Sequence, residues 1–246
     1  MHLTVLTGAS RGLGRALLDQ LLQRDHHVLA LSRGSIHVEP GHRGQLSHWP
    51  VDLADAAPIA QSLAAWLTGW DTSKLTSATL INNAGVVSQL APLSEVKSSD
   101  LVNALRVGLE APTLLTAAFL KATASWPVPR KVVLVSSGLG RKAMAASASY
   151  CAAKAGLDHL ARAVALEEAS KPSGARIVSL APGVIDTDMQ VQLRAADPGK
   201  FPDLHRFTEL KSAGQLDSPS TAAAKLLTYM GRADFGNNPV GDVRDV

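Results

Sequence analysis

The sequence predicts an α/β fold: a doubly wound parallel sheet in a single domain, with helices on both faces. Two observations predict it. Short β-rich runs alternate with longer segments whose apolar residues recur at helical spacing, and neither an internal repeat nor an interdomain linker interrupts the series. Because such alternation is typical of parallel strands joined by covering helices, we expect residues 1–246 to form one such domain.

The elements follow in order along the chain. The expected strands are residues 3–6, 27–31, 78–82, 131–136 and 175–180, and the expected helices lie near 13–21, 98–124 and 149–169. Residues 125–131 should form a loop, because Pro127 and Pro129 cannot lie in a central strand. Residues 188–216 are less periodic and are interrupted by proline and glycine, so we expect a lid over the substrate.

Composition and charge exclude several classes of protein. Hydrophobic residues make up 46% and charged residues 18% of the chain, which excludes disordered, collagen-like and coiled-coil proteins. The net charge of +3 comes without a basic run, so we expect no nucleic-acid partner. Cys151 is the only cysteine, which excludes an intramolecular disulfide, and we assign no residue to a metal.

The N-terminus and the hydropathy bear on location. "MHLTVLTGAS" passes directly into a strand-like pattern, without the charged leader, apolar core and cleavage site of a signal peptide. No apolar run approaches the ~20 residues that would span a bilayer. We therefore expect a cytoplasmic protein with no membrane partner.

"TGASRGLG", residues 7–14, joins the first expected strand to the first expected helix. Glycines allow a tight turn and a close approach to a phosphate, and the N-terminus of a helix offers unpaired N–H groups and the positive end of a dipole. The spacing of Gly8, Gly12 and Gly14 differs from the G-x-G-x-x-G pattern, so on this segment alone a turn without a ligand stays open.

The end of the second expected strand indicates which dinucleotide would bind. Folds that prefer NAD usually place an acid there, which bonds the ribose 2′-hydroxyl. This strand instead ends in Ser32 and Arg33, and Arg11 in the glycine loop adds a second cation. Two guanidinium groups and a hydroxyl suit a 2′-phosphate, so NADP(H) is favoured over NAD, with solvated surface arginines as the alternative.

Four motifs together resemble a known family. "TGASRGLG", "NNAG", "YCAAK" and "APGVIDTDM" occur in the order and spacing of the short-chain dehydrogenase/reductases, and the resemblance covers essentially the whole chain. Residues 201–219 are further similar to the branch that contains sepiapterin reductase and bacterial benzil reductase. The resemblance implies a Rossmann-type fold, a nicotinamide cofactor, and a homodimer or homotetramer.

The resemblance also assigns the reacting groups. Tyr150 and Lys154 stand one helical turn apart, and a lysine cation favours a nearby phenolate, so we expect Lys154 to lower the pKa of Tyr150. By similarity, Tyr150 exchanges a proton with the substrate oxygen and Lys154 also holds the nicotinamide ribose. Ser137 lies at the family's spacing before Tyr150 and should polarise the carbonyl, whereas Ser136 points the other way along the strand. The alternative is a surface Tyr–Lys pair without chemistry.

The remaining family positions transfer one by one to the cofactor. Asp52 and Leu53 resemble the pair beside the adenine ring, and residues 83–85 resemble the support of the adenosine ribose. The full set expected at the cofactor is Gly8, Ser10, Arg11, Gly12, Leu13, Gly14, Ser32, Arg33, Asp52, Leu53, Asn83, Ala84, Gly85, Tyr150, Lys154, Pro182, Gly183, Ile185 and Thr187. Asn82 is left out, because a structural role explains part of that motif.

One position departs from the family pattern. The family usually has an asparagine where this sequence has Gly108, and the main-chain carbonyl of that residue helps to hold a water that links the lysine to solvent. Pro112 has no N–H to donate to the Gly108 carbonyl, so an acceptor is left free in mid-helix, where a water could bind. We therefore expect a relay that survives but is less rigid.

The expected activity is the NADPH-dependent reduction of a ketone, and the narrower resemblance favours a vicinal dicarbonyl such as an aromatic 1,2-diketone. Met144, Met189, Leu193 and Phe207 could line its pocket, although each is more often a core residue. Two alternatives stay open. One is an NADP(H)-binding regulatory or sensor protein with weak catalysis, which Gly108 motivates, and the other is an NAD-dependent alcohol dehydrogenase.

Overall fold

The computed structural model describes residues 1–245, and within that range a single sheet of seven strands is present. The strands are β1 (His2–Thr7), β2 (His26–Ser32), β3 (Gln45–Pro50), β4 (Ser77–Asn82), β5 (Arg130–Val135), β6 (Arg176–Ala181) and β7 (Val240–Asp242). They lie in the order β3-β2-β1-β4-β5-β6-β7, and every neighbouring pair is parallel. The chain therefore forms the doubly wound, Rossmann-type sheet that the sequence predicts.

Alternate residues of the inner strands belong to two hydrophobic cores on opposite faces of the sheet. In β2, Leu29 and Leu31 belong to one core, whereas Val28 and Ala30 belong to the other. All four side chains are fully buried. Full burial of a leucine or valine side chain stabilises the fold by roughly 1.5–3 kcal/mol. Because both faces are covered, such strands are continuous apolar runs, which is why their sequence pattern predicts them well.

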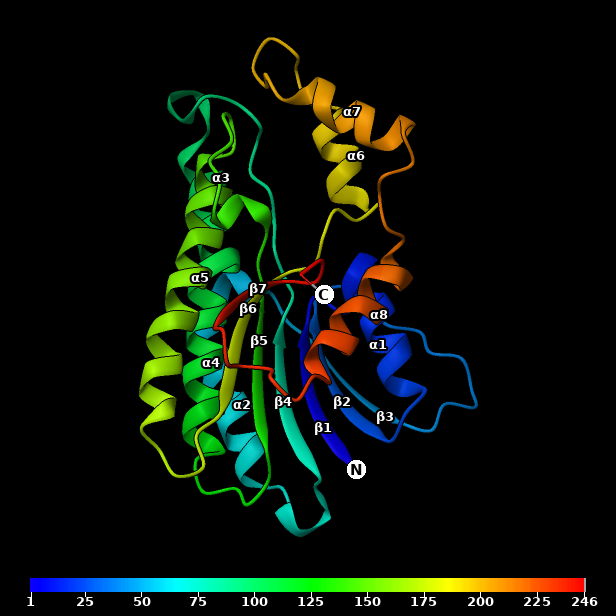
Figure 1. The fold of residues 1–246 in the computed structure, drawn as a ribbon, viewed down its shortest axis with the longest axis vertical. Helices are drawn as coiled ribbons and strands as arrows, with labels where there is room; N and C mark the ends of the chain where they lie inside the picture. Colours follow the sequence, from blue (N-terminus) through cyan, green and yellow to red (C-terminus); the bar gives the residue numbers. More distant parts are fainter. Residues whose placement is uncertain (246) are drawn as a thin grey trace.

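Helices cover both faces of the sheet, as Figure 1 shows. One face carries α2 (Ala56–Thr68), α4 (Ala111–Ala122) and α5 (Ala148–Ala169), and the other carries α1 (Gly12–Leu22) and α8 (Pro219–Met230). Leu63 of α2 and Leu157 of α5 pack into the first core, and Leu17 of α1 and Leu226 of α8 pack into the second. Between Met1 and Asp245, no helix is long and apolar enough to cross a membrane.

The helix expected near residues 98–124 is interrupted in its middle. Helix α3 (Ser98–Leu105) passes into a π-helical turn, η4 (Arg106–Glu110), which passes into α4. The N–H of Ala111 donates to the carbonyl of Arg106, which is the five-residue hydrogen bond of a π-helix. Gly108 is therefore part of a π-helical turn, a feature that helical periodicity alone does not predict.

The segment expected to be a lid contains two short helices, α6 (Asp188–Arg194) and α7 (Leu204–Ser212), which lie beyond the end of the sheet in Figure 1. Between them, Phe201 is fully buried and stacks on Phe207 with 5.7 Å between ring centroids. Lys200 Nζ lies 2.7 Å from Glu95 Oε2 in the connection after β4. The short 3₁₀ turns of the connections are η1 (Leu53–Asp55), η2 (Thr72–Lys74), η3 (Leu93–Glu95) and η5 (Gly138–Gly140).

Candidate active site

The expected site residues gather at one edge of the sheet, where the carboxyl ends of the parallel strands meet. Gly8 follows β1, Ser32 ends β2, and Asn83 follows β4. Ser137 and Pro182 come shortly after β5 and β6. Residues that are far apart in the sequence therefore form a single site.

The glycine loop is a backbone cradle that has no room for side chains. Gly8 and Gly12 have φ values of +70° and +54°, which favour glycine. A Cβ on Gly14 would lie only 2.0 Å from the carbonyl oxygen of Gly8. Helix α1 begins after Arg11 without a side-chain cap and without an acid in its first turn, so its N–H groups and dipole are left to an external anion. This cradle fits the pyrophosphate of a dinucleotide.

Thr7 and Asn83 hold the glycine loop against the end of β4. The Thr7 hydroxyl accepts hydrogen bonds from the backbone N–H groups of Asn83 and Ala84, each at 2.9 Å. Asn83 Nδ2 donates to the carbonyls of Thr7 and Gly8 at 3.0 and 3.3 Å. The side chain of Asn83 thus supports the loop. Thr7 is missing from the expected set, and a hydroxyl at the end of a buried strand is the signal that could have identified it.

The expected phosphate-recognition residues differ in how free they are to bind a ligand. Ser32 is buried, its hydroxyl donates to the carbonyl of Gly34 at 3.1 Å, and it lies 3.1 Å from His48 Nε2. Arg11 and Arg33 are instead exposed, with 71% and 65% of their side-chain surface accessible. The two arginines therefore remain available to a phosphate, whereas the Ser32 hydroxyl is already bonded within the protein. Arg33 NH1 lies 3.9 Å from Asp52 Oδ2, so the end of β2 and the start of η1 are neighbours.

The turn after β6 packs on the glycine loop. Gly183 has a φ of +83°, which lets the chain reverse there. A Cβ on Gly12 would lie 3.3 Å from the methyl group of Thr187, so these two segments are in contact. Ile185 pairs with Asp217 in an isolated parallel bridge, which fixes the segment from its other side. Of the other expected cofactor residues, Ser10 lies in the glycine loop, Leu13 in the first turn of α1 and Leu53 at the start of η1. Gly85 and Pro182 follow the ends of β4 and β6.

Ser137, Tyr150 and Lys154 come together from two segments. Ser137 precedes η5, and its Oγ accepts a hydrogen bond from the N–H of Leu139 at 3.2 Å. Tyr150 lies in the first turn of α5, and Lys154 follows one turn later. Lys154 is only 4% exposed, its Nζ donates to the carbonyl of Val135 at 2.7 Å, and it lies 5.5 Å from the centroid of the Tyr150 ring.

Burial sets the protonation of this pair. It raises the pKa of Tyr150 to about 12, while a hydrogen bond with Ser137 opposes the shift. It lowers the pKa of Lys154 to about 8, while the charge of Asp158 opposes the shift. The expectation that Lys154 lowers the pKa of Tyr150 is therefore wrong for this structure, because removal of the phenol from water has the larger effect. Tyr150 is therefore protonated at neutral pH.

Gly108 lies against the helix that carries Lys154. It is buried within η4, and a Cβ at this position would lie 3.0 Å from the Cβ of Ala153, the residue before Lys154. Such a contact is tighter than ordinary packing, so glycine allows η4 to approach α5 closely. The asparagine of the family pattern has no room here unless η4 or α5 moves.

A cavity of about 300 Å³ lies between the connection after β4 and helix α6. Ser88, Leu90 and Gln192 are among its lining residues. The hydroxyl of Ser88 lies 2.8 Å from that of Ser149, the residue before Tyr150. The cavity is of the size that takes a small ligand, and it borders the start of α5.

The four side chains expected to line a pocket are mainly core residues. Met144, Leu193 and Phe207 are buried in a small core that includes Phe201, and Met189 packs against it. These residues hold the α6–α7 segment to the body of the protein. They therefore act on the site only through the position of the α6–α7 segment.

Comparison with protein families agrees with this geometry. The model of the short chain dehydrogenase family matches residues 2–198. The chain belongs to the short-chain dehydrogenase family. This dehydrogenase is thus an oxidoreductase that acts on CH–OH or C=O groups with a nicotinamide cofactor.

Curated relatives place the dehydrogenase in the branch that the sequence motifs indicate. It is 32% identical to a benzil reductase ((S)-benzoin forming) of Bacillus cereus, over 99% of this chain and 98% of the relative. It is 33% identical to the Bacillus subtilis (strain 168) protein of the same name, over 100% and 99% of the two chains. It is also 33% identical to sepiapterin reductase of Rattus norvegicus, over 98% and 96%.

Solved structures share the whole fold of the dehydrogenase. The enzyme KRED1-Pglu superposes with a TM-score of 0.81 at 27% identity, over 98% of this chain and 100% of the other. A putative 2-deoxy-D-gluconate 3-dehydrogenase from Agrobacterium tumefaciens, solved with bound NADP, superposes with a TM-score of 0.77 at 25% identity, over 98% and 94%.

Sequence reasoning missed a group of charged residues on and beside α5. Asp158 stands four residues after Lys154, just as Lys154 stands four after Tyr150, so a third polar group on one face of an alanine-rich helix was a usable signal. Arg141 and Asp242 carried no such signal, because folding alone brings β7 beside η5.

Proposed function

We propose that this short-chain dehydrogenase is an NADPH-dependent carbonyl reductase in which Tyr150 gives a proton to the substrate oxygen. The observation that carries the proposal is the convergence of Ser137, Tyr150 and Lys154 at the carboxyl edge of the sheet. The Lys154 cation beside the phenol favours the phenolate that remains once the proton has been given away.

Ser137, Tyr150 and Lys154 have separate roles in the proposed reduction of a carbonyl group. The Oγ of Ser137 accepts from the N–H of Leu139, and its hydroxyl proton, which bonds with Tyr150 here, can donate to a carbonyl oxygen when a substrate is bound. Tyr150 gives its proton to that oxygen as negative charge develops on it. Lys154, fixed by the carbonyl of Val135, places a cation beside the phenolate that forms. When bound, NADPH supplies the hydride that adds to the carbonyl carbon.

The two exposed arginines support NADPH over NADH. Arg11 and Arg33 flank the glycine loop and the end of β2, where the adenosine ribose lies in folds of this type. A 2′-phosphate would give each guanidinium a doubly charged partner. The carboxylates of Asp52 and Asp188 now lie beside these arginines, and NADPH binding would draw the guanidinium groups away from them.

For the substrate we propose a vicinal dicarbonyl, such as an aromatic 1,2-diketone. Support comes from the two benzil reductase relatives, which align over almost the entire chain. The residues proposed to act are Ser137, Tyr150 and Lys154, in one cytoplasmic domain whose α6–α7 segment serves as a lid. We also propose a homodimer or homotetramer, as the resemblance to this family implies.

The test is the consumption of NADPH, followed at 340 nm, with a panel of aromatic 1,2-diketones, quinones and simple ketones. NADH is run in parallel, and the dissociation constants of both cofactors are measured. We expect turnover with NADPH that is fastest for the 1,2-diketones. Measurable NADPH binding without turnover of any carbonyl would contradict the proposal and favour a cofactor-binding regulatory protein.

A further inference from the structure

Asp158 is a buried carboxylate one helical turn after Lys154. It is 2% exposed, and its Oδ1 accepts hydrogen bonds from the hydroxyls of Ser136 and Ser179, at 2.7 and 2.6 Å. Its Oδ2 accepts no hydrogen bond from residues 1–245, and the nearest cation is Nε of Arg141 at 3.4 Å. A buried carboxylate is costly unless it is paired, so this cluster needs an explanation beyond packing.

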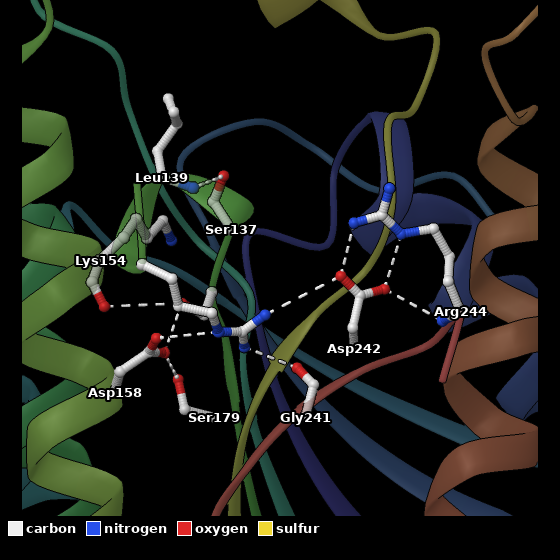
Figure 2. Close-up of polar contacts among 10 residues, drawn as sticks. Ser137, Leu139, Lys154, Asp158, Ser179, Gly241, Asp242 and Arg244 are labelled. Carbon is white, nitrogen blue, oxygen red and sulfur yellow. Dashed lines mark hydrogen bonds and ion pairs between the residues drawn. The ribbon is translucent and has the colours of Figure 1, made fainter. Parts of the chain in front are cut away.

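Arg141 connects Asp158 to the C-terminal strand. One of its terminal nitrogens donates to the carbonyl of Gly241 at 2.7 Å, and the other lies 3.9 Å from Asp242 Oδ2. Asp242 is itself held by Arg244, through contacts of 2.8 and 2.6 Å. Figure 2 shows the network, with Asp158 and Lys154 on the α5 side and Asp242 and Arg244 on the other.

The turn that carries Arg141 packs directly on the helix that carries Lys154. A Cβ on Gly140 would lie 2.9 Å from both Asp158 Oδ2 and the carbonyl oxygen of Lys154. The same turn begins with Ser137. The contacts of Lys154 Nζ and Asp158 Oδ1 also fall on consecutive residues at the end of β5, the carbonyl of Val135 and the hydroxyl of Ser136. The two side chains are therefore anchored to adjacent residues of the chain, without a direct ion pair between them.

We propose that Asp158 and Arg141 are positioning residues: Asp158 fixes a negative charge beside Lys154, and Arg141 ties that carboxylate to the turn after Ser137 and to β7. The inference rests on the proposed function, in which Lys154 is a catalytic residue. It extends the site to the C-terminal strand, about 100 residues away in the chain.

Among the charged groups around Lys154, Asp158 is the one expected to act on the charge of the lysine. On the segments packed against this part of α5, Arg106 and Glu110 of η4 are exposed, and Asp100 of α3 accepts from the N–H of Gln89. Tyr150 is protonated, as its raised pKa requires. The charge that acts on the Lys154 ammonium is that of Asp158, which holds the pKa of the lysine up against burial.

Two substitutions should therefore shift the titration of Lys154 in opposite directions. Asp158→Asn keeps one acceptor oxygen for the two serine hydroxyls but removes the charge, so Lys154 should titrate about one pH unit lower. Arg141→Gln removes the cation that offsets Asp158, so Lys154 should titrate at a higher pH. Arg141→Lys retains the charge and should restore the wild-type midpoint. If the two substitutions only disturbed packing, they would not shift the Lys154 midpoint in opposite directions.

Glu168→Gln is the matched control. Glu168 is another buried carboxylate on α5, where it accepts from the N–H of Ala175 at 2.8 Å and pairs with Lys171. It stands fourteen residues after Lys154, which on a helix is about 21 Å. Its removal should weaken the helix and leave the titration of Lys154 unchanged.

The experiment follows the ¹³Cε resonance of Lys154 against pH in ¹³C-lysine-labelled protein, with the resonance assigned by its loss in Lys154→Arg. The alkaline limb of the NADPH-dependent rate is the second readout. Equal midpoints in the wild type and Asp158→Asn would overturn the inference, as would a downward shift in Arg141→Gln or a Glu168→Gln shift of the same size. If Asp158→Asn does not fold, the direction of the Lys154 midpoint shift in Arg141→Gln tests the inference by itself. A wild type that reduces no carbonyl refutes the proposed function but leaves the NMR test intact.

Discussion

At the scale of single residues, Arg33 is the side chain on which the cofactor assignment most depends. It projects from the end of β2, and a carboxylate 3.9 Å away is its only ion-pair partner among the described residues. A guanidinium can bind a phosphate through two N–H groups, whereas NADH presents only a hydroxyl at the same place. Its contribution should therefore be specific to NADPH.

Arg33→Ala is expected to raise the dissociation constant of NADPH about tenfold to a hundredfold, because a charge-assisted bidentate contact is lost. The dissociation constant of NADH should change less than about threefold, since no phosphate contact is lost with it. Fluorescence titration with both cofactors measures the two values. Arg162→Ala, which removes an exposed arginine from the outer side of α5, should change neither. Equal weakening of both cofactors in Arg33→Ala would argue for a general structural role.

At the scale of elements, the contact between η4 and α5 determines which residue fits at position 108. The π-helical turn brings Gly108 so near Ala153 that any side chain meets its Cβ at 3.0 Å. The family pattern would place an asparagine there, which requires η4 or α5 to give way by a few tenths of an ångström. The glycine thus allows the close packing of η4 on α5.

Gly108→Asn is expected to destabilise the protein by about 1–3 kcal/mol, because the extra atoms overpack the η4–α5 contact. Turnover should not rise, since α5 carries both Tyr150 and Lys154 and would be displaced. Urea unfolding and the NADPH-dependent rate measure the two effects. The double variant with Ala153→Gly should recover much of the lost stability. A rise in turnover by several orders of magnitude in Gly108→Asn would instead mean that the relay to solvent is broken in the wild type.

The elements also show how far the sequence predicts this structure. The five buried strands were predictable because each is a continuous apolar run. The edge strand β3 was not, because residues such as Gln45 and Ser47 interrupt its pattern, and β7 is only three residues long. The glycine loop and the Tyr–Lys spacing are local patterns, so the sequence predicts them. The link from Arg141 to Asp242 depends on tertiary contacts alone, and the raised pKa of Tyr150 depends on burial that no local pattern reveals.

At the scale of the whole molecule, two histidines at the start of β1 and β2 affect how stability depends on pH. The rings of His2 and His26 stack with 5.0 Å between centroids, and His26 Nδ1 lies 3.0 Å from the Thr4 hydroxyl. Burial, followed by the charge of His2, lowers the pKa of His26 from 6.5 to about 4. Between these two values the unfolded chain binds more protons than the native protein, so stability falls as the pH falls.

The midpoint of urea unfolding is therefore expected to drop as the pH is lowered from about 6.5 to about 4, with little change above pH 7. His26→Asn removes the titrating group but can keep a hydrogen bond to Thr4, so its midpoint should fall less over the same range. Unfolding curves at pH 7.5, 6 and 5 make the comparison. An identical loss in the variant and the wild type would assign the effect to other groups.

The most direct test of the account is the rate of NADPH oxidation with the best 1,2-diketone, compared between the wild type and Tyr150→Phe. Phenylalanine keeps the ring that packs beside Lys154 and removes only the proton that the mechanism needs. The account predicts a fall in kcat of about a thousandfold or more, with the dissociation constant of NADPH within about threefold of the wild-type value. A variant that retained most of its activity would contradict the claim that Tyr150 gives the proton.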